Sequence, residues 1–131
     1  SAGVSRQLRA AGWPLPTGDP VAEIREEIKP ESDDLVLPRG TYSPFAGTDL
    51  LDVLERARIQ TLVLAGMLAN TTVALAAQEA ADRGFGVILV WDASASETLD
   101  WHDNMKTRLV SPLIRMRTTK QLIEMMKGVR T

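Results

Sequence analysis

The sequence contains no cysteine and only one histidine, His102, among its 131 residues. Without thiols the chain can form neither a disulfide framework nor a thiolate metal site, and it offers no cysteine nucleophile. An excess of basic residues is also missing, because 15 lysines and arginines stand against 17 aspartates and glutamates. The basic residues are scattered along the chain, which argues against a nucleic acid as a partner.

Long apolar runs are missing as well, so no segment predicts a transmembrane helix and no membrane is expected as a partner. A hydrophobic share of 44% and a charged share of 24% are typical of one globular domain in solution. The absence of cysteine is compatible with the cytoplasm, which is the localisation we expect. We expect neither a cofactor nor a metal ion.

The stretch from Ile59 to Asp92 carries the strongest structural pattern. Apolar runs at 61–65 and 86–91 flank a helical pattern over 71–83. Strand, helix and strand in this order predict a βαβ unit, and therefore a parallel sheet. Ligands of such sheets bind beyond the carboxyl ends of the strands. The turn 66–72 and Asp92 both follow a strand, so they are the first places to look for a site.

The remaining segments predict a lead-in followed by further α/β elements. Residues 1–34, rich in proline and glycine, predict an N-terminal arm and lead-in, and residues 35–131 predict the α/β core of a single domain. The expected elements of that core are a short strand at 35–37, a helix capped by Thr48, a helix opened by a capping box at 94–97 and extending to about Arg108, a strand at 113–116, and a helix opened by a capping box at 118–121 and ended by Gly128.

Alanine dominates the helix at 71–83, with Ala74, Ala76, Ala77, Ala80 and Ala81 on several of its sides. Small side chains permit close packing on two sides, against the sheet and against a second helix or subunit. Alanine is also simply a good helix former. Both explanations stay open at this point.

Three blocks in fixed order resemble the isochorismatase-like, or cysteine hydrolase, superfamily. They are the Arg39–Asp49 stretch RGTYSPFAGTD, the turn GMLANTTV at 66–73, and VWDA at 90–93 followed by Glu97 and His102. The resemblance covers residues 35 to about 104. It implies a three-layer, Rossmann-like parallel sheet with strand order 3-2-1-4-5-6.

The hydrolytic members of that family use an aspartate, a lysine and a cysteine, and this chain departs from all three. The lysine position falls on Arg39 and the cysteine position on Thr72, and nothing before Leu35 matches the strand that carries the aspartate. Arginine can clamp a carboxylate at two points but cannot shuttle protons, and a threonine hydroxyl needs a dedicated base. Isochorismatases proper, which hydrolyse a vinyl ether, lack the cysteine too. Ala69, where most cysteine hydrolases carry threonine, resembles that branch.

The resemblance therefore implies a hydrolase that acts non-covalently on a small, anionic metabolite. Arg39 and Thr72 are the expected catalytic residues, and the expected substrate-binding residues are Tyr42, Phe45, Ala69, Asn70 and Thr71. Main-chain N–H groups of 70–72 would face an anion, and an aspartate outside this sequence would supply the proton. The alternative is a degenerate, non-catalytic member that binds a small molecule or serves as an assembly subunit.

Structural explanations exist for the same residues. Asn70 can cap the helix, Thr72 can fill its first turn, and Asp92 can cap the turn after its strand. His102 can pack on a helix surface, and Tyr42, Phe45 and Trp91 can pack in a core or an interface. Because the first two family strands have no match, the sheet would keep an open edge. We therefore expect the chain to be a fragment or to be completed by another polypeptide, and to form homo-oligomers.

Overall fold

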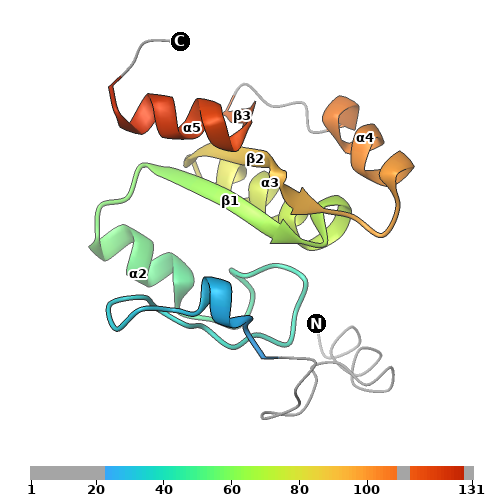
Figure 1. The fold of residues 1–131 in the computed structure, drawn as a ribbon. Coiled ribbons are helices and arrows are strands. Elements are labelled where there is room, and N and C mark those ends of the chain that lie inside the picture. Colours follow the sequence, from blue (N-terminus) through green and yellow to red (C-terminus); the bar gives the residue numbers. More distant parts are fainter. Residues whose placement is uncertain (1–22, 109–112, 129–131) are drawn as a thin grey trace.

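The computed structural model describes residues 23–108 and 113–128 of the chain. The elements follow one another in Figure 1 as η1 (Glu26–Ile28), α2 (Leu50–Arg56), β1 (Thr61–Met67), η2 (Ala69–Val73), α3 (Ala74–Asp82), β2 (Gly86–Ala95), α4 (Leu99–Arg108), β3 (Ile114–Arg117) and α5 (Thr119–Met126). The expected arm before residue 23 lies outside the described residues.

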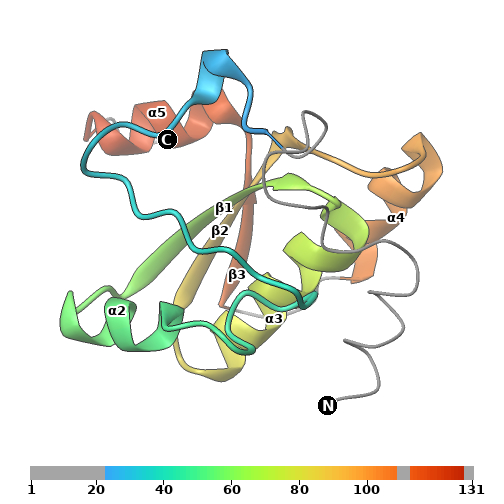
Figure 2. The same cartoon turned by 90° about the horizontal axis from the view of Figure 1, so that it is seen from below.

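The three described strands form one parallel sheet in the order β1-β2-β3. β1 pairs in parallel with β2 from Thr61, opposite Gly86, and β2 pairs in parallel with β3 from Val87, opposite Ile114. Figures 1 and 2 show α3 and α5 on opposite faces of this sheet. The predicted βαβ unit and the parallel α/β fold class are therefore confirmed.

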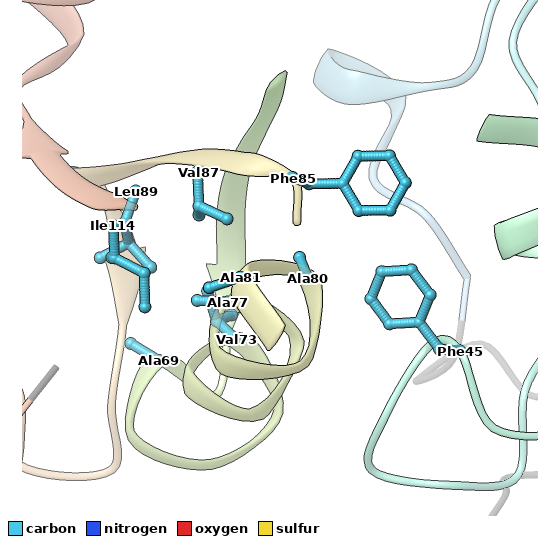
Figure 3. Packing of buried hydrophobic residues seen from close by; sticks show 10 residues of the cluster. All are labelled: Phe45, Ala69, Val73, Ala77, Ala80, Ala81, Phe85, Val87, Leu89 and Ile114. Atoms are coloured by element: carbon cyan, nitrogen blue, oxygen red, sulfur yellow. The ribbon is translucent and has the colours of Figure 1, made fainter. Parts of the chain in front are cut away.

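The core lies between α3 and the sheet. Because strand side chains alternate between faces, Val87 and Leu89 both point toward α3, and both are fully buried. Figure 3 shows them over the buried alanines 77, 80 and 81 of that helix. Burying one such aliphatic side chain contributes about 1.5–3 kcal/mol. Alanine thus serves close packing of α3 on the sheet.

The strands β1 and β2 separate near their carboxyl ends. Their pairing is regular as far as Leu64, opposite Leu89, and then resumes with Gly66 opposite Ser94. Gly66 has a φ of 119°, which favours glycine because other residues carry a Cβ. On its other side, β2 pairs with β3 from Val87 to Val90, so this pairing ends near the point where the pairing with β1 is interrupted. The separation occurs at the edge of the sheet where ligands of parallel α/β folds bind.

Two predicted elements differ from the structure: the strand at 35–37 is absent, and the helix after β2 begins later than expected. Residues 35–37 form no strand, because no neighbouring strand offers them hydrogen bonds, and Leu35 and Val36 are 59% and 56% exposed. The helix predicted from a capping box at 94–97 begins only at Leu99. Ser94 still belongs to β2, and the Thr98 hydroxyl accepts from the N–H of Trp101.

Other predicted ends lie at or near the positions that the structure shows. Thr118 and Gln121 form the expected capping box of α5, and Gly128 follows it with a φ of 74°. The Thr48 hydroxyl accepts from the Leu50 N–H at 3.2 Å, but the N-cap position of α2 belongs to Asp49, so the helix begins one residue later than predicted. The helix expected at 71–83 begins two residues earlier, as the π-helical turn η2, and continues as α3.

The outer edge of β1 exposes apolar surface. β1 is an edge strand of the described sheet, and its sequence, TLVLAGM, contains no charged residue. Val63 and Met67 are 50% and 71% exposed. Exposed, uncharged edge strands promote association with another strand.

We predict that the 131-residue chain is not a stable monomer. Sedimentation at micromolar concentration should show association, and Val63→Lys should shift the distribution toward monomer, because a charge on an edge strand opposes strand pairing. Val53→Lys, at a comparably accessible position of α2, is the matched control. A wild-type chain that sediments as a cooperatively melting monomer would contradict this prediction, and with it the expectation that a partner completes the sheet.

Candidate functional site at the start of α3

The turn between β1 and α3 is built around the carbonyl group of Leu68. This oxygen accepts from the N–H groups of Thr71 (3.3 Å) and Val73 (3.1 Å) and from the Thr72 hydroxyl (3.1 Å). The Met67–Leu68 peptide bond is cis. The turn η2 begins directly after it, at Ala69. The first N–H groups of a helix lack an acceptor within it, but in this turn the Thr71 N–H already donates to Leu68. An anion placed before this turn would therefore meet N–H donors.

The Thr72 hydroxyl is engaged with main-chain oxygens. Besides its contact to Leu68, it lies 3.0 Å from the carbonyl oxygen of Met67. Within the described part of the chain, no imidazole, amine or carboxylate is hydrogen-bonded to this hydroxyl. A threonine nucleophile needs such a base. The surroundings of Thr72 therefore suit a positioning role in the helix better than nucleophilic attack.

Asn70 and Thr71 each bury a side-chain oxygen, Oδ1 and Oγ1, that has no hydrogen-bond partner among the described residues. Buried polar atoms normally find a partner, so an exception points to strain or to a binding role. Neither residue caps the turn with its side chain, since Leu68 occupies the N-cap position. The expectation that Asn70 caps the helix was therefore wrong.

Ala69 opens the same turn but is fully buried in the core. Its methyl group faces Ile114 and Leu89 in Figure 3. A substrate cannot touch a residue without accessible surface, so direct substrate contact by Ala69 does not agree with this conformation. The small side chain instead lets the turn lie close to the sheet.

Arg39 heads a loop that hydrogen bonds hold in a compact shape. Its Nη1 donates to the carbonyl oxygens of Thr41 and of Tyr42, the latter at 2.8 Å. The four ion pairs among the described residues do not include Arg39. Its Nε and Nη2 thus remain as a two-donor edge, the geometry that suits a carboxylate. Tyr42, in the same loop, is 44% exposed.

Phe45 lies in the core and not at an open surface. It is buried beside Phe85 and Ala80 in Figure 3, and the Arg83 guanidinium lies 5.2 Å from its ring centre. The surroundings of Phe45 therefore agree with the packing explanation.

Sequence reasoning missed two residues near this loop, Ser43 and Glu79. The Ser43 hydroxyl donates to Glu79 on α3, and Glu79 pairs with Arg83 at 2.6 Å. The only available signal was the four-residue spacing of Glu79 and Arg83, which is common on helices.

His102 packs on Trp91, with ring centres 3.7 Å apart. The packing explanation for this histidine therefore holds, and its Nδ1 is buried without a hydrogen-bond partner among the described residues. The described residues contain no cluster of three or more histidine, aspartate or glutamate side chains that could hold a metal ion. No helix within them is long and apolar enough to cross a bilayer.

Asp92 caps a helix, although not the next one in the chain. Its Oδ1 accepts from the main-chain N–H of Thr119 (2.7 Å) and from the Thr119 hydroxyl (2.9 Å), at the start of α5. These bonds, the main-chain one above all, hold the pKa of the Asp92 carboxyl below its usual range. Asp92 is thus a carboxylate joined to α5. The expectation that it caps the turn after its own strand was wrong, because β2 continues to Ala95 and the carboxylate contacts Thr119 instead.

The fold is that of a parallel α/β protein, with a candidate site at the turn that follows β1. A family model of the isochorismatase domain matches residues 3–121, so the chain belongs to the isochorismatase family. The secreted isochorismatase effector Isc1 of Verticillium dahliae is 37% identical over 84 residues, or 63% of this chain and 44% of that protein. YwoC of Bacillus subtilis, an uncharacterized isochorismatase family protein, is 33% identical over 107 residues, or 81% and 56%.

Solved structures agree. An isochorismatase-like hydrolase from Alkaliphilus metalliredigens superposes with a TM-score of 0.78 at 29% identity, covering 83% of this chain and 60% of that one. Relatives with a stated activity include an isochorismatase of Bacillus subtilis, 33% identical over 67% of this chain and 28% of that protein, and a maleamate amidohydrolase of Pseudomonas putida, 29% identical over 66% and 40%. The chain spans about half the length of the curated relatives it matches.

The Asp92 contact predicts a pH-dependent loss of stability. Because the folded-state pKa of Asp92 is lowered, its contribution is present above the unfolded-state pKa, about 3.9, and disappears as the pH falls through the folded-state value. Asp92→Ala should therefore lower the free energy of unfolding at about pH 7, with the difference shrinking below about pH 4. Urea unfolding at both pH values measures this. Asp82→Ala, on the exposed end of α3, is the control. An Asp92→Ala difference that is independent of pH would contradict the assignment.

Proposed function

We propose that the protein is an isochorismatase-family hydrolase that acts on a small, anionic metabolite without a covalent intermediate. The observation that carries this proposal is the Thr72 hydroxyl, which points at two main-chain oxygens; we assign Thr72 to the family's cysteine position from the resemblance of the turn GMLANTTV. An oxygen nucleophile without a base is too weak to attack a carbonyl group. A reaction that relies on an acid and a water molecule requires no nucleophilic side chain here.

The two-donor edge of Arg39 supports an anionic substrate. A cation that forms no ion pair with the described residues has an unmet preference for a carboxylate. Arg39 and Tyr42 would bind the substrate from the loop, and Asn70, Thr71 and Thr72 would orient it from η2. Phe45 and Ala69, both buried, would shape the protein behind the site.

Proton donation is assigned to an aspartate from outside the 131 residues. For a vinyl ether, the acid would protonate the double bond, water would add to the resulting oxocarbenium carbon, and the carbon–oxygen bond of the hemiketal would break. Arg39 stays protonated and cannot replace that acid. The η2 N–H groups would bind the substrate anion throughout.

Hydrolysis assays on the product of the full gene test this function. Isochorismate, a vinyl ether, and maleamate, an amide, separate the two chemistries. We expect hydrolysis of the vinyl ether type, and Arg39→Ala should raise KM by about 10- to 150-fold, since charged hydrogen bonds contribute about 1.5–3 kcal/mol. Arg56→Ala, whose arginine pairs with Asp52 on the exposed side of α2, is the matched control.

Binding of both compounds without turnover, in a full-length chain that has no aspartate-ended strand upstream, would favour the non-catalytic alternative. A KM that Arg39→Ala leaves unchanged would remove Arg39 from the site. Both outcomes contradict the proposed function. Whether an aspartate-ended strand exists upstream can be read from the full gene sequence.

Thr72→Ala should leave most of the activity intact. The variant loses the hydroxyl contact to Met67 and Leu68, worth about 0.5–1.5 kcal/mol, so we expect at most about a tenfold decrease in kcat/KM. Thr72→Ser, which keeps the hydroxyl, should lie nearer to wild type. A decrease of many thousandfold, with an ester on Thr72 trapped and seen by mass spectrometry, would establish Thr72 as the nucleophile.

A further inference from the structure

A single hydrogen bond joins the Arg39 loop to the helix that follows the candidate site. Among the hydrogen bonds of the described residues, only the one from the Ser43 hydroxyl to Glu79 Oε2 links the segment 39–48 to α3. Figure 2 shows this loop passing over α3 on its way to α2. The stacking of Arg83 on Phe45 lies beside this bond.

The loop itself is internally fixed. Arg39 holds the carbonyl groups of Thr41 and Tyr42, and the Thr41 hydroxyl donates to the carbonyl groups of Ser43 (2.8 Å) and Ala46 (2.9 Å). The Ser43 hydroxyl oxygen also accepts from the Phe45 N–H at 3.1 Å. The loop is also held on the core by Phe45, which is buried and lies 5.2 Å from the Arg83 guanidinium, so the bond at Ser43 sets the placement of the residues that precede Phe45.

Glu79 suits the role of an anchor. It is only partly exposed, and it accepts from Ser43 with one oxygen and from Arg83 with the other. The hydrogen bond from Ser43, followed by the one from Arg83, holds the pKa of the Glu79 carboxyl below its usual range. An ionised carboxylate accepts stronger hydrogen bonds than a neutral group does.

The anchor lies within reach of the candidate site. Glu79 follows Thr72 by seven residues, which corresponds to about 10 Å along a helix axis. From Ser43 back to Arg39 there are four residues, which span at most about 14 Å. A loop attached at Glu79 can therefore present the Arg39 guanidinium to η2. Without this bond, only the burial of Phe45 holds the loop on the core, and residues 39–43 are free to shift relative to η2.

We propose that Glu79 is a positioning residue for substrate binding, which through Ser43 holds the Arg39 loop on α3 so that the guanidinium faces η2. This inference rests on the proposed function in that Arg39 binds the substrate. It goes further because Glu79 touches no substrate, and its effect reaches the substrate only through the loop.

Tyr42 offers a direct readout, since it is the only tyrosine of the chain and lies in this loop. 3-Fluorotyrosine incorporated during expression gives one fluorine NMR signal, and it reports the state of the loop without any substrate. Glu79→Ala and Ser43→Ala should each shift or broaden that signal, and the double variant should add nothing further. Glu79→Gln, whose amide oxygen still accepts from Ser43, should restore most of the wild-type signal. Asp82→Asn, nearby on the exposed end of α3, is the control.

Kinetics of the same variants connect the loop to the substrate. For whichever of isochorismate and maleamate the full-length protein hydrolyses, Glu79→Ala and Ser43→Ala should raise KM by about tenfold and change kcat by less than about twofold, as expected when one charged hydrogen bond to substrate is weakened. In the double variant KM should rise no further, because both substitutions release the same contact. Thermal melting identifies any variant that does not fold. If Glu79→Ala does not fold, Ser43→Ala and Glu79→Gln still compare a loop without the Ser43–Glu79 hydrogen bond with a loop that keeps it.

The NMR and kinetic results distinguish a failure of the positioning role of Glu79 from a failure of the proposed function. An unchanged Tyr42 signal in Glu79→Ala and Ser43→Ala, or an altered signal with unchanged KM while Arg39→Ala raises KM, would overturn the positioning role and leave the proposed function standing. Absence of turnover, or a KM that does not respond to Arg39→Ala, would overturn the proposed function and with it the role of Glu79 toward substrate.

Discussion

Close contact between α3 and the strands β2 and β3 is the interaction on which the rest of the structure depends. Fully buried Val87 and Leu89 lie directly against alanine side chains of the helix. Larger residues at those helix positions would push α3 away from the sheet, because cores are packed at high density. The approach of α3 also fixes η2, its first turn, at the carboxyl end of β1.

The candidate site combines this fixed turn with a loop that is attached from the side. On the turn, the Leu68 carbonyl gathers three donors, so the Thr72 hydroxyl is directed toward the main chain. On the loop, Arg39 uses Nη1 for main-chain hydrogen bonds, and the proposed function assigns its Nε and Nη2 to a ligand. A rigid donor turn and a cation on a separate segment are suited to recognising a small anion from two sides. Neither part supplies a proton donor of its own, which is why the proposed mechanism assigns that role to an acid outside these 131 residues.

Local patterns in the sequence predicted the parts of the fold that depend on neighbouring residues. The runs around Val63 and Leu89 predicted two parallel strands, and Thr118 predicted the start of α5, since periodicity and capping are local signals. Strand 35–37 failed because a strand exists only beside a partner. Ser94 was misassigned as a cap because β2 continues past its expected end to return to β1. Asp92 and Ser43 bind residues 27 and 36 positions away, and spacing within one element cannot indicate such contacts.

The proposed function depends on Arg39 and η2 binding the same ligand molecule. The most direct test is a crystal structure of the full-length protein with a non-hydrolysable carboxylate analogue of the substrate that it accepts. We predict that one carboxylate of the ligand lies against Nε and Nη2 of Arg39, and that the main-chain N–H groups at the start of η2 face the same ligand. A ligand that contacts only one of the two segments, or Arg39 and η2 on opposite faces of the sheet, would contradict the account.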